Sequence, residues 1–75
     1  MTYSDEIKKI RQKCFLSQEA FARELAVSFS TINRWEAGKV RPNLLAMKKL
    51  KEFCEVNHID FNELENEWVQ KGKDE

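Results

Sequence analysis

Residues 18–37 read QEAFARELAVSFSTINRWEA, and this stretch decides the fold. Its apolar residues recur at the spacing of two short helices. Two residues separate Leu25, at the end of the first helix, from Ser28, the expected cap of the second, so the helices must cross steeply. On the second helix, Ile32 and Trp35 face one side and a row of polar side chains faces the other. A helix that shows such a row to water suits the major groove of DNA.

The rest of the chain is also predicted to be helical, because its apolar residues repeat at helical spacing behind capping residues. With 75 residues, the chain is expected to form a single all-α domain over 1–75, a compact domain of five helices. The expected caps and helices are Ser4 before 5–13, Ser17 before 18–25, Ser28 before 29–37, Asn43 before 44–56 and Asp60 before an acidic C-terminal helix at about 61–71. The predicted core residues are Ile7, Ile10, Cys14, Phe21, Ala22, Leu25, Ile32, Trp35, Leu44, Met47, Leu50, Phe53, Cys54, Phe61, Leu64 and Trp68.

Charge is distributed unevenly along the chain although the net charge is zero. Residues 1–51 contain eleven basic and five acidic side chains, a net of +6, and residues 52–75 contain two basic and eight acidic ones, a net of −6. A basic body favours a polyanion as partner. The alternative is that two solvated faces merely differ in sign.

The sequence offers little for catalysis or metal binding. His58 is the only histidine, and with Cys14 and Cys54 it makes at most three metal ligands without a CxxC pair. We expect no catalytic residue, cofactor, metal or small-molecule substrate, and therefore no enzyme. No apolar run is long enough to span a membrane and the N-terminus does not resemble a signal peptide, so a cytoplasmic location with free thiols is expected.

The segment LSQEAFARELAVSFSTINRWEAGKVRP, residues 16–42, resembles the helix-turn-helix family of lambda repressor and Cro, the XRE family. The resemblance extends from about Ile7 to Leu64 and places the helix-turn-helix motif at 18–37. It implies a five-helix DNA-binding domain whose second motif helix enters the major groove of double-stranded DNA. The residues that match the family pattern are Leu16, Gln18, Ala22, Leu25, Val27, Ile32, Trp35, Glu36, Gly38, Lys39 and Pro42.

The resemblance also assigns roles on the DNA side. Arg34 can donate two hydrogen bonds to guanine, and Asn33 can pair with adenine or, nearly as well from its lateral position, contact phosphate. The alternative for each is a solvated surface residue. The implied base-reading residues are Phe29, Ser30, Asn33 and Arg34, and the implied DNA-backbone residues are Gln18, Thr31, Lys39, Arg41 and Asn43.

Two residues depart from the family pattern. Ala26 stands at the turn position that is usually glycine, and if this position needs a positive φ, alanine costs about 1 kcal/mol. Phe29 is an apolar side chain at a reading position. It can pack on a thymine methyl group or belong to a protein contact.

Several side chains have two readings. Trp35 is expected in the core rather than as a stacking platform for bases. Glu36 is expected to be structural, with Arg23 or Arg41 as its partner. Trp68 either folds back onto the body or joins a homodimer seam with Phe61 and Leu64. The cations of the first helix, Lys8, Lys9, Arg11 and Lys13, are expected to be available to solvent or phosphate.

The functional hypothesis is therefore sequence-specific binding of double-stranded DNA by a bacterial or phage transcriptional regulator, a repressor or an activator. A second hypothesis keeps the DNA contact but makes the chain an antitoxin or the DNA-targeting module of a larger system. A third is a protein-interaction domain that has lost DNA binding, which Phe29 and the acidic C-terminal helix favour.

Overall fold

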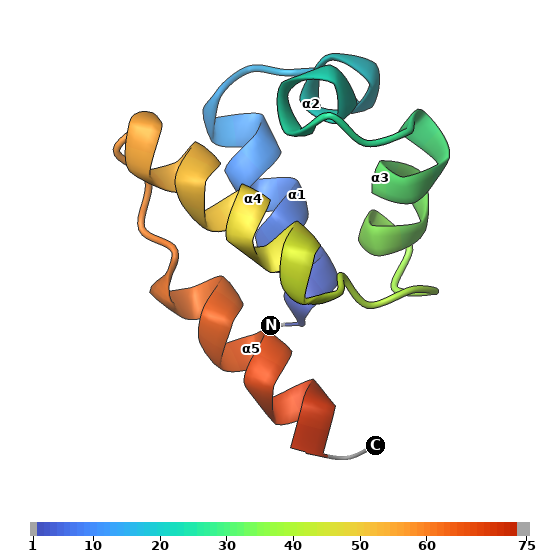
Figure 1. Ribbon diagram of the computed structural model, residues 1–75, viewed down its shortest axis with the longest axis vertical. Coiled ribbons are helices and arrows are strands. Elements are labelled where there is room, and N and C mark those ends of the chain that lie inside the picture. Colours follow the sequence, from blue (N-terminus) through green and yellow to red (C-terminus); the bar gives the residue numbers. More distant parts are fainter. Residues whose placement is uncertain (1, 74–75) are drawn as a thin grey trace.

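Five helices form the part of the chain that the structure, a computed structural model, describes: residues 2–73, with side chains through residue 70 (Figure 1). α4 crosses the middle of the molecule beside α1. The helices α2 and α3 lie along the upper side, and α5 lies below (Figure 1). The domain is all-α, as predicted. The helices are α1 (Tyr3–Lys13), α2 (Gln18–Leu25), α3 (Phe29–Glu36), α4 (Leu44–Val56) and α5 (Asn62–Lys73).

Three of the expected helix caps are confirmed. A side-chain oxygen at each cap accepts a hydrogen bond from the backbone amide three residues later, at 2.8–3.1 Å, and so satisfies a donor that the first helical turn leaves unpaired. The three pairs are Ser17 with Ala20, Ser28 with Thr31, and Asn43 with Ala46.

The cap of α1 was predicted wrongly. Thr2, not Ser4, precedes the helix: its hydroxyl accepts from the Asp5 amide at 3.3 Å, and the Asp5 carboxylate accepts from the Thr2 amide at the same distance. This reciprocal pair is a capping box. It starts the helix early enough for Tyr3 to join the core, where its side chain is buried.

The predicted apolar stripes meet in one core, with Ile7, Phe21 and Ile32 fully buried. Leu44 is the exception, because this first residue of α4 is 69% exposed. The turn of α4 that faces the core contributes Ala46 instead, and Leu44 points away from it.

α5 packs against α1 and closes the lower side of the core (Figure 1). Leu64 is fully buried, and Lys9 of α1 lies 3.7 Å from the Glu63 carboxylate. The Trp68 indole donates a hydrogen bond to the Pro42 carbonyl at 2.6 Å, and its ring lies under the Arg41 guanidinium at 4.0 Å. Trp68 therefore folds back onto the body of the domain, as one of its two readings predicted.

The first four helices all end in the same way. After each of them the chain passes through one residue with positive φ, and the next amide donates to the carbonyl five residues earlier at 2.8–3.3 Å. This is the Schellman arrangement, in which glycine is favoured because it has no Cβ. The four left-handed residues are Phe15 (φ 57°), Ala26 (φ 56°), Gly38 (φ 74°) and His58 (φ 57°).

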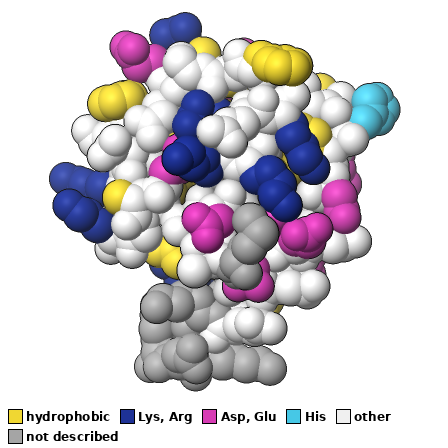
Figure 2. Space-filling model, turned by 180° about the vertical axis from the view of Figure 1, so that it is seen from behind, with side chains coloured by type: hydrophobic (Ala, Val, Ile, Leu, Met, Phe, Trp, Pro, Cys, Tyr) yellow, Lys and Arg dark blue, Asp and Glu magenta, His cyan; other side chains and the backbone are white. Residues whose placement is uncertain are grey.

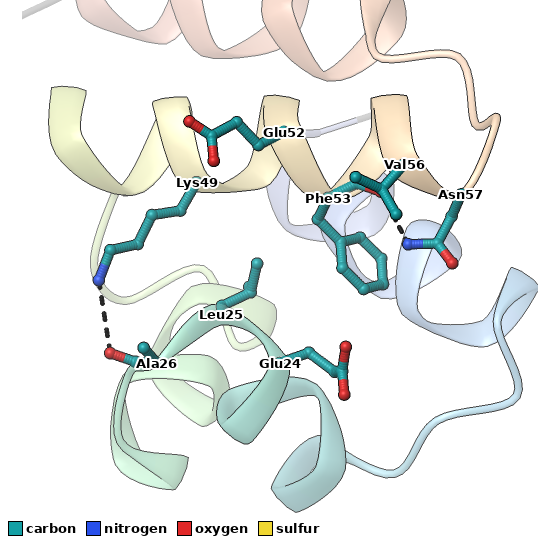
Figure 3. Close-up of a pocket in the computed structure, with 8 residues that line it drawn as sticks. All are labelled: Glu24, Leu25, Ala26, Lys49, Glu52, Phe53, Val56 and Asn57. Carbon is teal, nitrogen blue, oxygen red and sulfur yellow. Dashed lines mark hydrogen bonds between the residues drawn. The ribbon is translucent and has the colours of Figure 1, made fainter.

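Ala26 thus carries the strain that the sequence suggested, and glycine should relieve it. We expect Ala26→Gly to raise the free energy of unfolding by about 1 kcal/mol. Lys49 of α4 donates to the Ala26 carbonyl across an open groove (3.4 Å), a contact that the change leaves in place (Figure 3).

Gly38→Ala is the matched control for Ala26→Gly. A Cβ at this position would meet Ser4 Oγ at an ordinary 3.7 Å, so its cost of about 1 kcal/mol would come from φ alone. Urea denaturation of the two variants measures both changes. Equal stability of the Ala26 variant and the wild type would show that the turn is not strained.

Cys54 is fully buried, and this burial raises the pKa of its thiol from 9.0 to about 11. The folded state therefore holds the proton more tightly than the unfolded chain. Its contribution to stability is complete below about pH 9 and is lost as the pH rises toward 11. We expect the free energy of unfolding to fall by ~2 kcal/mol more in the wild type than in Cys54→Ala between about pH 8 and about pH 10.5. Parallel pH profiles of the two proteins would contradict this.

Candidate DNA interface

α3 presents two opposite faces, and this follows from its sequence. Ile32 and Trp35 are buried, which confirms Trp35 as a core residue. Ser30, Asn33 and Arg34 are exposed on the other side. A short helix with this division keeps a row of hydrogen-bonding side chains at the surface.

Phe29 begins α3 and is 49% exposed. Its ring stands beside the polar row at the start of the helix, since Phe29 and Asn33 are four residues apart. The implied base-reading residues thus all lie on the exposed part of α3. Their roles at DNA bases stay predictions.

The implied DNA-backbone residues are more varied. Lys39 is exposed, whereas Thr31 is half-buried with its hydroxyl 2.8 Å from the Ser28 hydroxyl. Asn43 Oδ1 is engaged in capping α4. Arg41 is half-buried over Trp68, so α5 influences where its guanidinium lies. These contacts leave the phosphate roles as predictions.

Gln18 lies in a small hollow that three helices form. We call this hollow the polar notch. It has a volume of about 270 Å³. It brings the start of α2 next to the exposed face of α3 and to α1. Its lining residues are Lys8, Arg11, Gln18, Asn33, Glu36 and Ala37.

Glu36 is structural, as predicted, but its partner is Arg11, not Arg23 or Arg41. Arg11 Nε donates to Glu36 Oε2 at 2.7 Å and a terminal nitrogen donates to Oε1 at 3.0 Å. The two side chains are 13% and 5% exposed. The hydrogen bond to Glu36 raises the pKa of Arg11. Arg11 also donates to the Leu16 carbonyl at 2.8 Å, so the expectation that it is available to phosphate was wrong.

Lys8 and Arg11 were expected from the sequence only to be available to solvent or phosphate, and their place in the polar notch was not predicted. For Arg11 a signal existed, because it lies four residues after buried Ile7 and next to buried Ile10, at the edge of the apolar stripe. For Lys8 the sequence contains no such signal, since its place in the notch depends on how α1 crosses α2 and α3.

Positive and negative side chains occupy different parts of the surface. Seen from behind, Lys and Arg side chains gather across the middle of the face, and Asp and Glu side chains gather below them, toward α5 (Figure 2). The acidic residues of the first turn of α5, Glu63 and Glu65, agree with this. On this face the acidic side chains thus lie mostly toward α5, where Lys9 of α1 lies 3.7 Å from the Glu63 carboxylate.

Within residues 2–73, no three His, Cys, Asp or Glu side chains are grouped to hold a metal ion. In the same range, no helix is both long and apolar enough to cross a membrane.

Two short helices, α2 and α3, joined by a tight turn at Ala26, and the exposed polar row on α3 define a helix-turn-helix DNA-binding domain. A family model described as helix-turn-helix, HTH_3, matches residues 7–61, and the chain belongs to this family. This confirms the resemblance to the XRE family.

A curated relative is the HTH-type transcriptional activator BcrR of Enterococcus faecalis, 34% identical over 56 residues. The match covers 75% of this chain and 28% of BcrR. The family indicates a DNA-binding domain, and the chain spans less than a third of the length of this relative. No solved structure matches the chain significantly.

Proposed function

We propose that the domain binds a specific sequence of double-stranded DNA, with α3 in the major groove, as part of a transcriptional regulator. The observation that carries the proposal is the exposed row Ser30, Asn33 and Arg34 opposite the buried Ile32 and Trp35. Buried anchors hold the helix on the core, and the polar row is left to meet base edges.

Affinity and specificity have different sources in this proposal. Phosphate contacts from the basic part of the chain, Lys39 among them, supply the salt-dependent attraction. Arg34, a planar donor on the exposed face, supplies a guanine contact, and Asn33 supplies an adenine contact. Phe29 adds an apolar contact that suits a thymine methyl group.

The test is selection of bound duplexes from a random pool, followed by a salt titration on the enriched sequence. We expect one motif, binding that falls steeply with salt, and loss of about 1–3 kcal/mol of discrimination at one motif position in Arg34→Ala. Lys39→Ala is the matched control: it should weaken binding to all sequences alike. If the wild-type protein enriches no motif at low salt, the proposed function fails.

A homodimer is a further expectation of this proposal, and a palindromic motif would support it. The side chains that the sequence suggested for the dimer seam pack mainly within the chain, because Leu64 is fully buried and Phe61 and Trp68 are half-buried. Sedimentation at the concentrations used for DNA binding measures the oligomeric state.

Protein interaction is the second candidate, and exposed apolar side chains favour it. Leu44, Leu45 and Val40 are 69%, 62% and 44% exposed close to one another along the chain. Such a group is unusual on a small surface and suits contact with protein. A failed duplex selection would direct attention to this group and to Phe29.

A further inference from the structure

A chain of hydrogen bonds crosses the polar notch from the buried ion pair to the exposed face of α3. Arg11 donates twice to Glu36. Glu36 Oε1 accepts from Gln18 Nε2 at 3.1 Å, and Gln18 Oε1 accepts from Asn33 Nδ2 at 3.2 Å. Every donor in this series points toward the carboxylate, so the series has one direction.

The ion pair dictates that direction. A carboxylate ionised by its guanidinium partner only accepts hydrogen bonds, so Gln18 must turn its NH₂ group toward Glu36. The Gln18 carbonyl then faces Asn33, which must donate. Neither amide can rotate by half a turn without losing a hydrogen bond.

The remaining atoms of the Asn33 amide are its carbonyl oxygen and one N–H. This acceptor and donor are the pair that adenine needs, because its N6 group donates and its N7 accepts in the major groove. An Asn33 rotated by half a turn would place its carbonyl against the Gln18 carbonyl, where no hydrogen bond can form, and would turn its NH₂ group away from Gln18.

We propose that Glu36 is a positioning residue that acts through Gln18 to hold the Asn33 amide in the orientation that reads adenine. Arg11 fixes Glu36 from the side of the core. Gln18 and Asn33 therefore act as one unit, which joins the start of α2 to base readout by α3. This inference rests on the proposed function, since it needs Asn33 to face a base.

A contact of Gln18 with phosphate alone predicts a different result. Its loss would weaken binding to every duplex by the same factor, because phosphate contacts carry no sequence information. The positioning role instead predicts a loss confined to the base that Asn33 reads. The two roles are thus separated by the pattern of the loss along the motif.

The experiment compares the duplexes selected by the wild type, Gln18→Met, Asn33→Ala and the double variant. Gln18→Met keeps the length of the half-buried side chain and removes its amide. We expect Gln18→Met to reduce the adenine preference roughly five- to 150-fold at the motif position that Asn33→Ala also flattens, and the double variant to lose no more than either single one. Gln70→Met, an exposed change on α5, is the control and should keep the whole motif.

The variant Arg11→Met/Glu36→Leu tests the ion pair itself. It removes both charges together, so that neither is left buried without a partner. The base preference assigned to Asn33 should weaken, whereas the preference assigned to Arg34 should remain, and a merely structural role would not separate the two. In the free wild-type protein, nuclear magnetic resonance should show side-chain amide resonances of Asn33 that are shifted from those of a solvent-exposed asparagine, with protons that exchange slowly with water. In Gln18→Met both effects should be lost.

Each result decides the inference. A uniform loss of affinity in Gln18→Met, with the motif unchanged, overturns it and leaves the proposed function standing. A wild-type protein that enriches no motif overturns both. An Asn33 amide signal that is unaffected by Gln18→Met also overturns the inference, whatever the DNA result.

Discussion

Glu36→Ala should destabilise the domain by about 3–5 kcal/mol, because it leaves the Arg11 guanidinium largely buried without its counter-charge. A domain of this size is stable by only about 5–15 kcal/mol, so much of this protein would be unfolded on warming. Urea denaturation followed by circular dichroism measures the loss.

Arg11→Met/Glu36→Leu is the control for that prediction. Replacing a buried ion pair by apolar side chains of similar size is often neutral, and the double variant should be at least about 2 kcal/mol more stable than Glu36→Ala. The Leu16 carbonyl keeps its donor in Glu36→Ala and loses it in the double variant, so the measured difference in stability is a lower bound on the cost of leaving Arg11 without its counter-charge. A cost below about 1 kcal/mol for Glu36→Ala would mean that the pair is solvated.

Trp68→Ala is expected to have the second large effect, a loss of about 3 kcal/mol. The variant removes the indole hydrogen bond to Pro42, the ring under Arg41 and the apolar contact of α5 with the core. α5 should then detach, so helix content should fall along with stability.

Trp68→Phe separates these contributions. It keeps a ring below Arg41 and loses the indole donor, which should cost about 1 kcal/mol. Thermal unfolding of both variants, together with the far-ultraviolet signal at low temperature, tests this. If Trp68→Ala unfolds at the wild-type midpoint with full helix content, then α5 does not depend on this contact.

The sequence was sufficient for features that depend on neighbours along the chain. Ser17, Ser28 and Asn43 cap helices because a side-chain oxygen reaches an amide three residues ahead, and that relation is visible in the sequence. The division of α3 into a buried side with Ile32 and an exposed side with Asn33 follows from helical periodicity in the same way.

Features that depend on how helices cross could not be predicted. Arg11 and Glu36 are 25 residues apart, and only the angle between α1 and α3 brings them together. Leu44 fits the apolar spacing of α4 but lies one turn beyond the part that the core covers. Ser4 was the expected cap of α1, but Thr2 caps it, and the earlier start allows Tyr3 to be buried.

The base-reading and backbone residues stand between these two cases. The exposed position of Arg34 follows from periodicity, but its contact with a base depends on how the domain docks on DNA. Gln18 is the clearest example. The family pattern places it at the DNA backbone, and the structure also joins it to Asn33 by a hydrogen bond.

The acidic residues of α5 lie at one end of the domain and the basic side chains lie mostly above them, so the charges are unevenly placed although the net charge is zero. The longest dimension is 31 Å, whereas electrostatic fields decay over about 8 Å at physiological ionic strength and about 30 Å in very dilute salt. At physiological ionic strength, DNA near the basic side chains would therefore not sense α5, and the attraction would come from the basic side chains closest to the duplex. In very dilute salt the negative end enters the same field, so attraction to DNA should level off where that of a uniformly basic domain continues to rise.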